Sequence, residues 1–172
     1  NITGEDYVGL LIGDVTGNWI PSAARTGDSR QLGGSWLESD IEIKAPDMVS
    51  RPGDEVIVPV VVDGIADKEI ISYEFDLRYD PAVIQPSDNP VDVAGTVSRG
   101  LSVVTNNKES RLLRVVVYGA MPIDQNGVLL NLRFKAVGEP GSLSALTFER
   151  IMFNEGEPRA TAVNGLIEIA AD

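Results

Sequence analysis

The sequence predicts an all-β fold: an antiparallel β-sandwich of jelly-roll topology, with roughly eight or nine strands and an irregular N-terminal extension. Three observations support this prediction. From residue 41 onward, short runs rich in Val, Ile and aromatic residues recur between clusters of Gly, Pro, Asp and Asn. Several of these runs alternate apolar and polar residues, as half-buried strands do. No amphipathic helical pattern follows residue 38, so the helices that a parallel sheet requires are missing.

The expected strands follow this punctuation along the chain. They cover residues 41–45, 55–62, 71–79, 112–118, 128–137, 144–153 and 163–169, with shorter strands inside 87–107. The clearest alternation places Tyr73, Phe75, Leu77 and Tyr79 inward and Ser72, Glu74, Asp76 and Arg78 outward. In 112–118 it places Leu112, Arg114, Val116 and Tyr118 outward, and in 128–137 it places Val128 inward. We predict a core that contains Phe75, Leu77, Val115, Val117, Leu130, Leu132, Phe134, Phe148 and Ile167.

Composition excludes several function classes. The chain has 172 residues and a formal net charge of −12, with 26 acidic residues against 14 basic ones. Such a charge disfavours nucleic-acid binding and attachment to anionic membranes. No apolar run is long enough for a transmembrane helix, so no membrane insertion is expected. Because the chain lacks both Cys and His, thiolate metal sites and Ser–His catalysis are excluded.

The pattern changes near residue 38. Residues 1–38 are predicted to be the tail of an upstream module plus a linker, and residues 39–172 to be the sandwich. The apolar run at residues 7–12 is followed by a stretch at 21–35 without periodicity, which is typical of a linker. We expect residues 1–20 to pack on the sandwich or on the upstream module.

Few residues suggest chemistry of their own. Glu74 and Asp76 share one strand face and could form the carboxylate pair of a glycosidase, but a solvated sheet face is the favoured interpretation. Asp80 is favoured as a turn residue over a calcium ligand because it precedes Pro81. The loop at residues 154–157 is likewise favoured as a solvated loop. No catalytic residue, no metal site and no cofactor is therefore predicted, and calcium is the one ion with candidate ligands.

Several segments in this order resemble the cohesin domain over residues 40–170, about three quarters of the chain. They are Arg51-Pro52-Gly53-Asp54 with the strand that follows it, Ile71 to Pro81 with its Tyr79-Asp80-Pro81 end, Gly127 to Ala136, Leu146 to Glu149, and Gly165 to Ile169. The segment Gly9 to Trp19 resembles the tail that follows dockerin-type repeats. It departs from their calcium loop, because Thr16 replaces a carboxylate and Trp19 stands where the loop needs Gly.

The resemblance implies a non-catalytic protein–protein interaction module of an exported multi-modular protein, extracellular or on the cell surface. It implies a dockerin-type helical partner on one sheet face, contacted by Ser72, Glu74, Asp76, Val116, Tyr118, Asn154, Glu155 and Gly156. An apolar centre with an acidic rim would suit a helix that carries Leu and Lys or Arg. Gly119 departs from the family, which commonly has a contacting carboxylate there. The alternative is a carbohydrate-binding module of the same broad fold, which would need a row of exposed aromatic residues.

Overall fold

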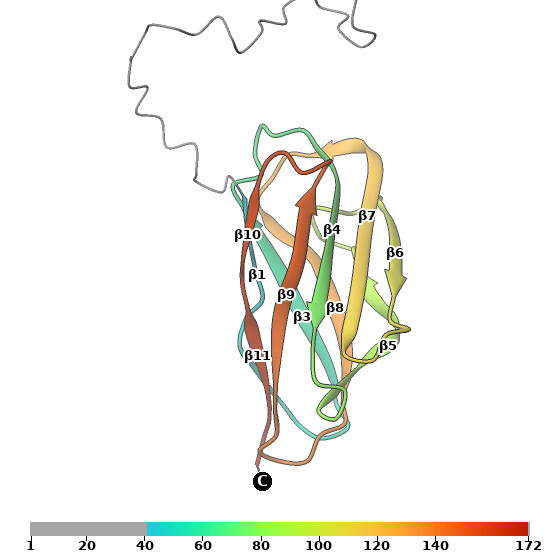
Figure 1. The fold of residues 1–172 in the computed structure, drawn as a ribbon, viewed down its shortest axis with the longest axis vertical. Coiled ribbons are helices and arrows are strands. Elements are labelled where there is room, and N and C mark those ends of the chain that lie inside the picture. Colours follow the sequence, from blue (N-terminus) through green and yellow to red (C-terminus); the bar gives the residue numbers. More distant parts are fainter. Residues whose placement is uncertain (1–40, 172) are drawn as a thin grey trace, which may run out of the picture. The chain divides into compact units, whose positions relative to one another are not determined.

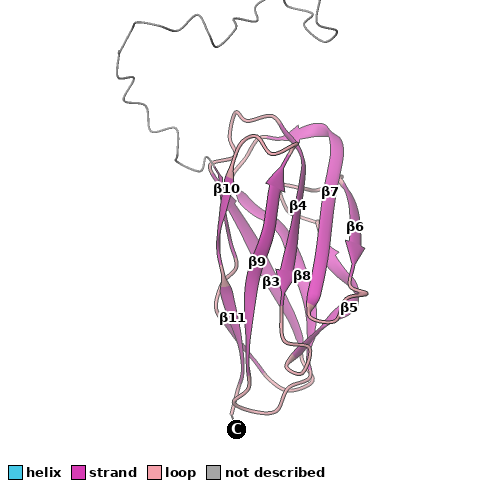
Figure 2. Ribbon diagram, in the orientation of Figure 1, coloured by secondary structure: helices cyan, strands magenta, loops and turns pink. Residues whose placement is uncertain are grey.

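Two β-sheets pack face to face in the computed structural model, which describes residues 41–171 (Figure 1). One sheet has five strands in the order β10-β1-β3-β8-β5, and the other has six in the order β2-β11-β9-β4-β7-β6. The strands are β1 (Ile41–Lys44), β2 (Met48–Ser50), β3 (Glu55–Asp63), β4 (Ile70–Arg78), β5 (Ile84–Asp92), β6 (Ser102–Asn106), β7 (Leu112–Ile123), β8 (Gly127–Ala136), β9 (Leu143–Phe153), β10 (Ala160–Val163) and β11 (Gly165–Ile169). Strands and loops alone make up the described part of the chain, which confirms the all-β sandwich (Figure 2).

The described residues form eleven strands, more than the predicted eight or nine. The chain passes from the five-stranded to the six-stranded sheet between β1 and β2, and again between β10 and β11. The strand expected at 163–169 is two strands: β10 pairs with β1 in the five-stranded sheet, and β11 pairs with β9 and β2 in the six-stranded one. The β1–β10 and β2–β11 pairs are parallel, and the other pairs are antiparallel. The crossing requires Gly165, because a Cβ there would lie 2.5 Å from the carbonyl oxygen of Pro46.

The core lies between the two sheets, and all nine residues predicted for it are buried. Aromatic side chains fill much of it. Phe75 of β4 meets Phe148 of β9 edge to face, with ring centroids 5.3 Å apart. Tyr79 meets Phe134 of β8 from the opposite sheet, with centroids 5.6 Å apart. The inward phase predicted for residues 73–79 is therefore correct.

Two predicted side-chain orientations are wrong. Val128 is only half-buried, because Val60 pairs with Leu130 and Val61 with Val128, which leaves Leu129 as the extra, buried residue of a β-bulge. Leu112 is buried rather than outward. It follows a tight turn in which its N–H donates to the carbonyl of Glu109, so the strand alternation begins only after it.

Four predictions lie outside the described residues: the tail-plus-linker assignment of residues 1–38, the boundary at 38, the packing of residues 1–20, and the resemblance of Gly9 to Trp19 to a dockerin tail. Within residues 41–171, no helix qualifies as a membrane span.

Candidate functional site

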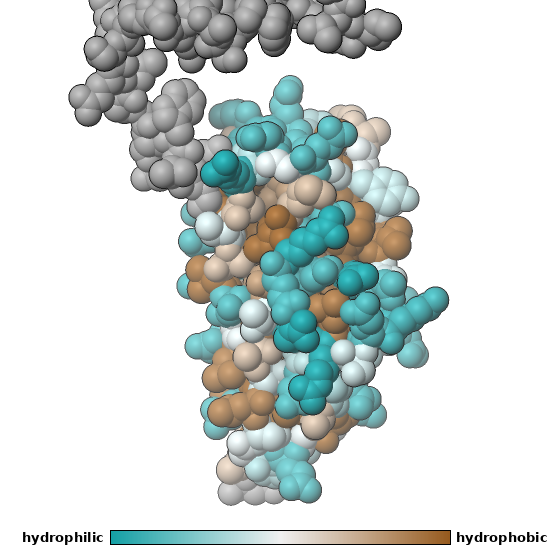
Figure 3. All heavy atoms as spheres, in the orientation of Figure 1, coloured by the Kyte–Doolittle hydropathy of each residue, from teal (hydrophilic) through white to brown (hydrophobic). Residues whose placement is uncertain are grey.

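The predicted contact residues of β4 and β7 meet on the outward face of the six-stranded sheet. Antiparallel pairing sets Ser72 opposite Tyr118 and Glu74 opposite Val116. Directly opposed residues of an antiparallel pair have Cβ atoms about 4.5–5.5 Å apart, so these side chains are neighbours on one surface. Figure 3 looks onto this sheet and shows a hydrophilic band along its middle with hydrophobic side chains on both sides.

Strand β6 extends this surface with an apolar residue. Val104 of β6 pairs with Val116 of β7, and both Val104 and Tyr118 are about half exposed. We call Val104, Val116 and Tyr118 the apolar patch. On the other side of β4, Met152 of β9 pairs with Glu74 and is partly exposed. The half of the face around Ser72 and Glu74 therefore combines apolar side chains with these two polar residues.

The carboxylates of the face do not form the free acidic rim that was expected. Glu74 forms an ion pair with Arg150 of β9. Asp76 lies 3.5 Å from the guanidinium of Arg114 on β7. Glu149 accepts two hydrogen bonds from Arg78. Each of these acidic groups is thus partnered by an arginine of a neighbouring strand, which changes the electrostatic character of the face.

Asn154 holds the loop at residues 154–156 against the start of β4. Its side-chain Oδ1 accepts from the backbone N–H of Ile71 at 3.0 Å and from that of Ser72 at 3.4 Å. Its backbone is left-handed, with φ of 48°. Glu155 is exposed, and the Gly156 N–H closes the turn onto the carbonyl of Phe153. The loop therefore borders the face at the Ser72 end, as expected, with Asn154 oriented toward the strand backbone.

Gly119 lies against the side chain of Leu101. A Cβ at this position would lie 2.3 Å from Cδ2 of Leu101, a residue packed against the core just before β6. A side chain at 119 would have to displace Leu101.

Sequence reasoning missed Val104, Arg150 and Met152 as members of the face. For β9 the cause is a β-bulge: Leu77 pairs with Phe148 and Asp76 with Arg150, so Glu149 is extra and the outward phase shifts from odd to even residues. No sequence signal marks this shift. For β6 the segment 87–107 is irregular, although the hydrophobic character of Val103 and Val104 is a usable signal.

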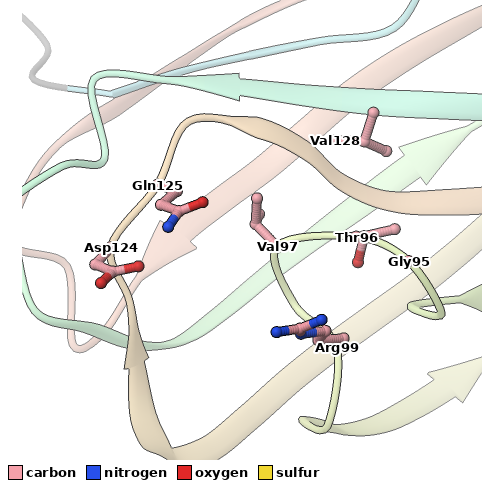
Figure 4. Close-up of a pocket in the computed structure, with 7 residues that line it drawn as sticks. All are labelled: Gly95, Thr96, Val97, Arg99, Asp124, Gln125 and Val128. Carbon is pink, nitrogen blue, oxygen red and sulfur yellow. The ribbon is translucent and has the colours of Figure 1, made fainter.

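One cavity of residues 41–171 offers no constellation of catalytic groups. The cavity in Figure 4, of about 430 Å³, lies between the loop at Gly95–Arg99 and the turn at Asp124–Val128. Asp124 and Arg99 are its charged lining residues, so it lacks the carboxylate pair of a glycosidase. Glu74 and Asp76 do not line this cavity and lie instead on the open sheet face.

Asp80 has the turn role that was predicted for it. Its carboxylate accepts from the backbone N–H of Ala82 at 3.0 Å. Within residues 41–171, no group of three or more acidic residues is placed to hold a metal ion. Among the aromatic side chains of this part of the chain, Tyr118 alone is exposed.

Comparison with known proteins finds a family model and a sequence relative that match this part of the chain. The family model described as cohesin domain matches residues 41–169. Cellulosomal-scaffolding protein A of Acetivibrio thermocellus is 30% identical over an alignment of 125 residues, and the match covers 64% of this chain. The match covers 6% of the length of that scaffolding protein.

Solved structures share the architecture. The sixth cohesin of scaffoldin B from Acetivibrio cellulolyticus, in complex with a mutant Cel5 dockerin, has a TM-score of 0.65 at 21% identity and covers 75% of this chain and 98% of that one. A non-cellulosomal cohesin from the archaeon Archaeoglobus fulgidus has a TM-score of 0.62 at 23% identity, with coverage of 77% and 92%. The two-sheet fold and the match over residues 41–169 together establish that this chain belongs to the cohesin family.

Proposed function

We propose that this chain is a non-catalytic interaction module that binds a dockerin-type helical partner on the outward face of β6, β7, β4 and β9. Family membership supports the class of function, and solved relatives were captured with dockerins, including the Coh-OlpA–Doc918 complex of Clostridium thermocellum. The observation that carries the proposal is the apolar patch at Val104, Val116 and Tyr118, set beside polar groups on an open sheet face.

This surface has the anatomy of a protein interface. Partly exposed apolar side chains form a continuous set across β6 and β7. Buried apolar centres with polar rims are typical of specific protein–protein contacts, and Tyr is among the residues enriched there. Ser72 and Asn154 border the patch at the Tyr118 end, and the Arg114–Asp76 ion pair borders it at the other end. An amphipathic helix laid across the strands would cover the patch.

The carbohydrate-binding alternative has less support. Stacking on sugar rings needs several exposed aromatic side chains. Within residues 41–171, Tyr118 is the one aromatic side chain that is exposed. For catalysis, Glu74 and Asp76 are partnered by arginines on an open face, without an enclosing pocket. We also propose an extracellular or cell-surface location, because the scaffolding relative is cellulosomal.

The test is a binding panel with the full chain. Isothermal calorimetry against purified dockerin modules, run beside a panel of soluble polysaccharides, should show saturable 1:1 binding to a dockerin and none to the polysaccharides. Binding to a polysaccharide alone would support the carbohydrate alternative. Hydrolysis of a polysaccharide or glycoside that is lost in Glu74→Gln or Asp76→Asn would contradict the non-catalytic assignment.

A further inference from the structure

Two ion pairs on the proposed docking face are layered, with the arginine outermost. The Arg150 side chain is 65% exposed and its partner Glu74 is 26% exposed. The Arg114 side chain is 48% exposed and lies between two carboxylates, Asp76 with 17% and Glu109 with 65% of the side chain exposed. The Arg78 side chain is 52% exposed, against 39% for Glu149. At Arg150 and Arg78 an approaching molecule therefore meets a guanidinium group before it meets the paired carboxylate, although the chain as a whole carries a net charge of −12.

The three arginines lie together around Asp76. Asp76 pairs with Arg114 of β7 on one side and with Arg150 of β9 on the other, so Arg114, Asp76 and Arg150 form one row across the sheet. Because neighbouring strands lie about 4.8 Å apart, the Cα atoms of Arg114 and Arg150 are about 10 Å apart. Arg78 lies two residues further along β4, on the same face. We call Arg78, Arg114 and Arg150 the arginine triad.

The opposite sheet does not share this arrangement. On the outward face of β3 and β8, Arg133 forms an ion pair with Glu55 at 2.8 Å. There the carboxylate is the more exposed member, with side-chain exposures of 45% for Glu55 and 36% for Arg133. The Arg133–Glu55 pair therefore differs from the Arg150–Glu74 and Arg78–Glu149 pairs, in which the arginine is the more exposed member.

We propose that the partner presents carboxylates to this triad: its docking helix places Glu or Asp over Arg78, Arg114 and Arg150, beside apolar residues that cover the patch. This inference rests on the proposed function and reverses the charge first expected for the partner. A guanidinium carries five N–H donors, and the Arg150–Glu74 pair engages Nη2. Arg150 therefore has Nε and Nη1 for a carboxylate of the partner, whereas Arg78 and Arg114 already direct Nε and Nη2 to carboxylates of this chain.

An arginine of the triad can keep its own carboxylate while it binds one of the partner. One carboxylate does not occupy all five N–H donors of a guanidinium. Interface closure would then remove water from the new pair and strengthen it. A helix with a few carboxylates suits this site better than a continuous polyanion, because the acidic remainder of the chain repels long polyanions.

The experiment uses the full chain and a dockerin that binds it in the panel above, in two versions. One version keeps the carboxylates of its docking helix, and the other has them changed to Gln or Asn. Dextran sulfate serves as the polyanion probe. On this side, the variants are Arg150→Gln and Arg114→Gln, with Arg133→Gln as the matched control, since it also removes an ion-paired arginine but from the opposite sheet.

We expect Arg150→Gln combined with Arg114→Gln to raise the Kd for the carboxylate version about 10-fold or more, and Arg133→Gln to leave it within about twofold. The amide version should bind more weakly to the unmodified chain and be insensitive to both triad changes. Raising the salt concentration should weaken the carboxylate version more than the amide version. Circular dichroism and the urea midpoint establish that each variant is folded.

Failure of this inference is distinguishable from failure of the proposed function. If Tyr118→Ala weakens dockerin binding while the triad changes do not, or strengthen it, the docking face stands and the charge assignment is wrong. If dextran sulfate binds through the triad and carboxylate dockerins do not, the ligand class is wrong. If no dockerin binds at all, the proposed function itself fails.

Discussion

The hydroxyl of Tyr73 lies 2.9 Å from the hydroxyl of Ser98, and both side chains are buried. Tyr73 lies in β4, between the face residues Ser72 and Glu74, and Ser98 lies in the loop that leads from β5 to β6. This hydrogen bond ties the loop to the central strand of the docking face. It also satisfies two polar groups that would be costly to bury alone.

This buried tyrosine predicts an alkaline limit to stability. Burial raises the pKa of Tyr73 well above its usual value, and the hydrogen bond with Ser98 offsets this only in part. Because the folded pKa is raised, the contribution is fully present below pH about 10, where tyrosine of the unfolded chain titrates, and is lost as the pH rises further. Tyr73→Phe should therefore flatten the fall in unfolding free energy between pH 9.5 and 11, as measured by urea denaturation.

The residual slope in that variant has a second source, since burial also raises the pKa of Tyr79. A wild-type slope identical to that of Tyr73→Phe would contradict the account.

Truncation of Phe134 tests the packing between the sheets. Phe134 is fully buried on β8, and its ring lies against Tyr79. Phe134→Ala should lower the unfolding free energy by about 3–5 kcal/mol, because it removes buried area and leaves a cavity. Tyr118→Ala, at an exposed position, should change it by less than about 0.5 kcal/mol. A loss below about 1 kcal/mol for Phe134→Ala would show that the core is assigned wrongly.

Asn154 combines a left-handed backbone with two hydrogen bonds to β4. Asn154→Gly keeps the backbone conformation and should cost about 1 kcal/mol of unfolding free energy through the lost side-chain bonds. Asn154→Ala should cost about 1 kcal/mol more, because a Cβ strains a left-handed residue. Urea denaturation of the two variants side by side checks this order, and an equal loss in both would remove backbone strain from the explanation.

Deletion of residues 1–38 tests the predicted domain boundary. The core that the structure describes already joins both sheets within residues 41–169, so the shortened chain should fold with a urea midpoint close to that of the full chain. Far-ultraviolet circular dichroism should keep its β-sheet signature. A shortened chain that fails to fold would mean that the N-terminal segment is an integral part of the sandwich.

Local sequence periodicity was sufficient to predict much of this fold. In β4, alternation from Ser72 to Arg78 assigns each side chain to the correct face, and the core residues of β7 and β8 follow from the same rule. Alternation does not reveal where it breaks. The bulges at Leu129 and Glu149 each add one residue, and nothing in the local pattern marks them.

The candidate site could be predicted only in part for a related reason. Ser72, Glu74, Val116 and Tyr118 lie on strands with clear phase, so their shared face was predictable. The ion pair between Glu74 and Arg150 joins residues far apart in sequence and depends on the register of β9 after its bulge. The electrostatic character of the face is therefore a property of strand pairing, which a single sequence does not disclose.

The most direct test of the central claim compares two matched double variants. Val104→Asp with Tyr118→Ala removes the apolar patch, and Val61→Asp with Ile57→Ala makes similar changes at half-exposed residues of β3 on the opposite sheet. Calorimetric titration with a dockerin that binds the full chain should show the Kd raised about 100-fold or more by the first pair, since central interface residues dominate affinity, and within about threefold for the second. Equal affinity in both folded variants, or a loss confined to the β3 pair, would contradict the assignment of the docking face.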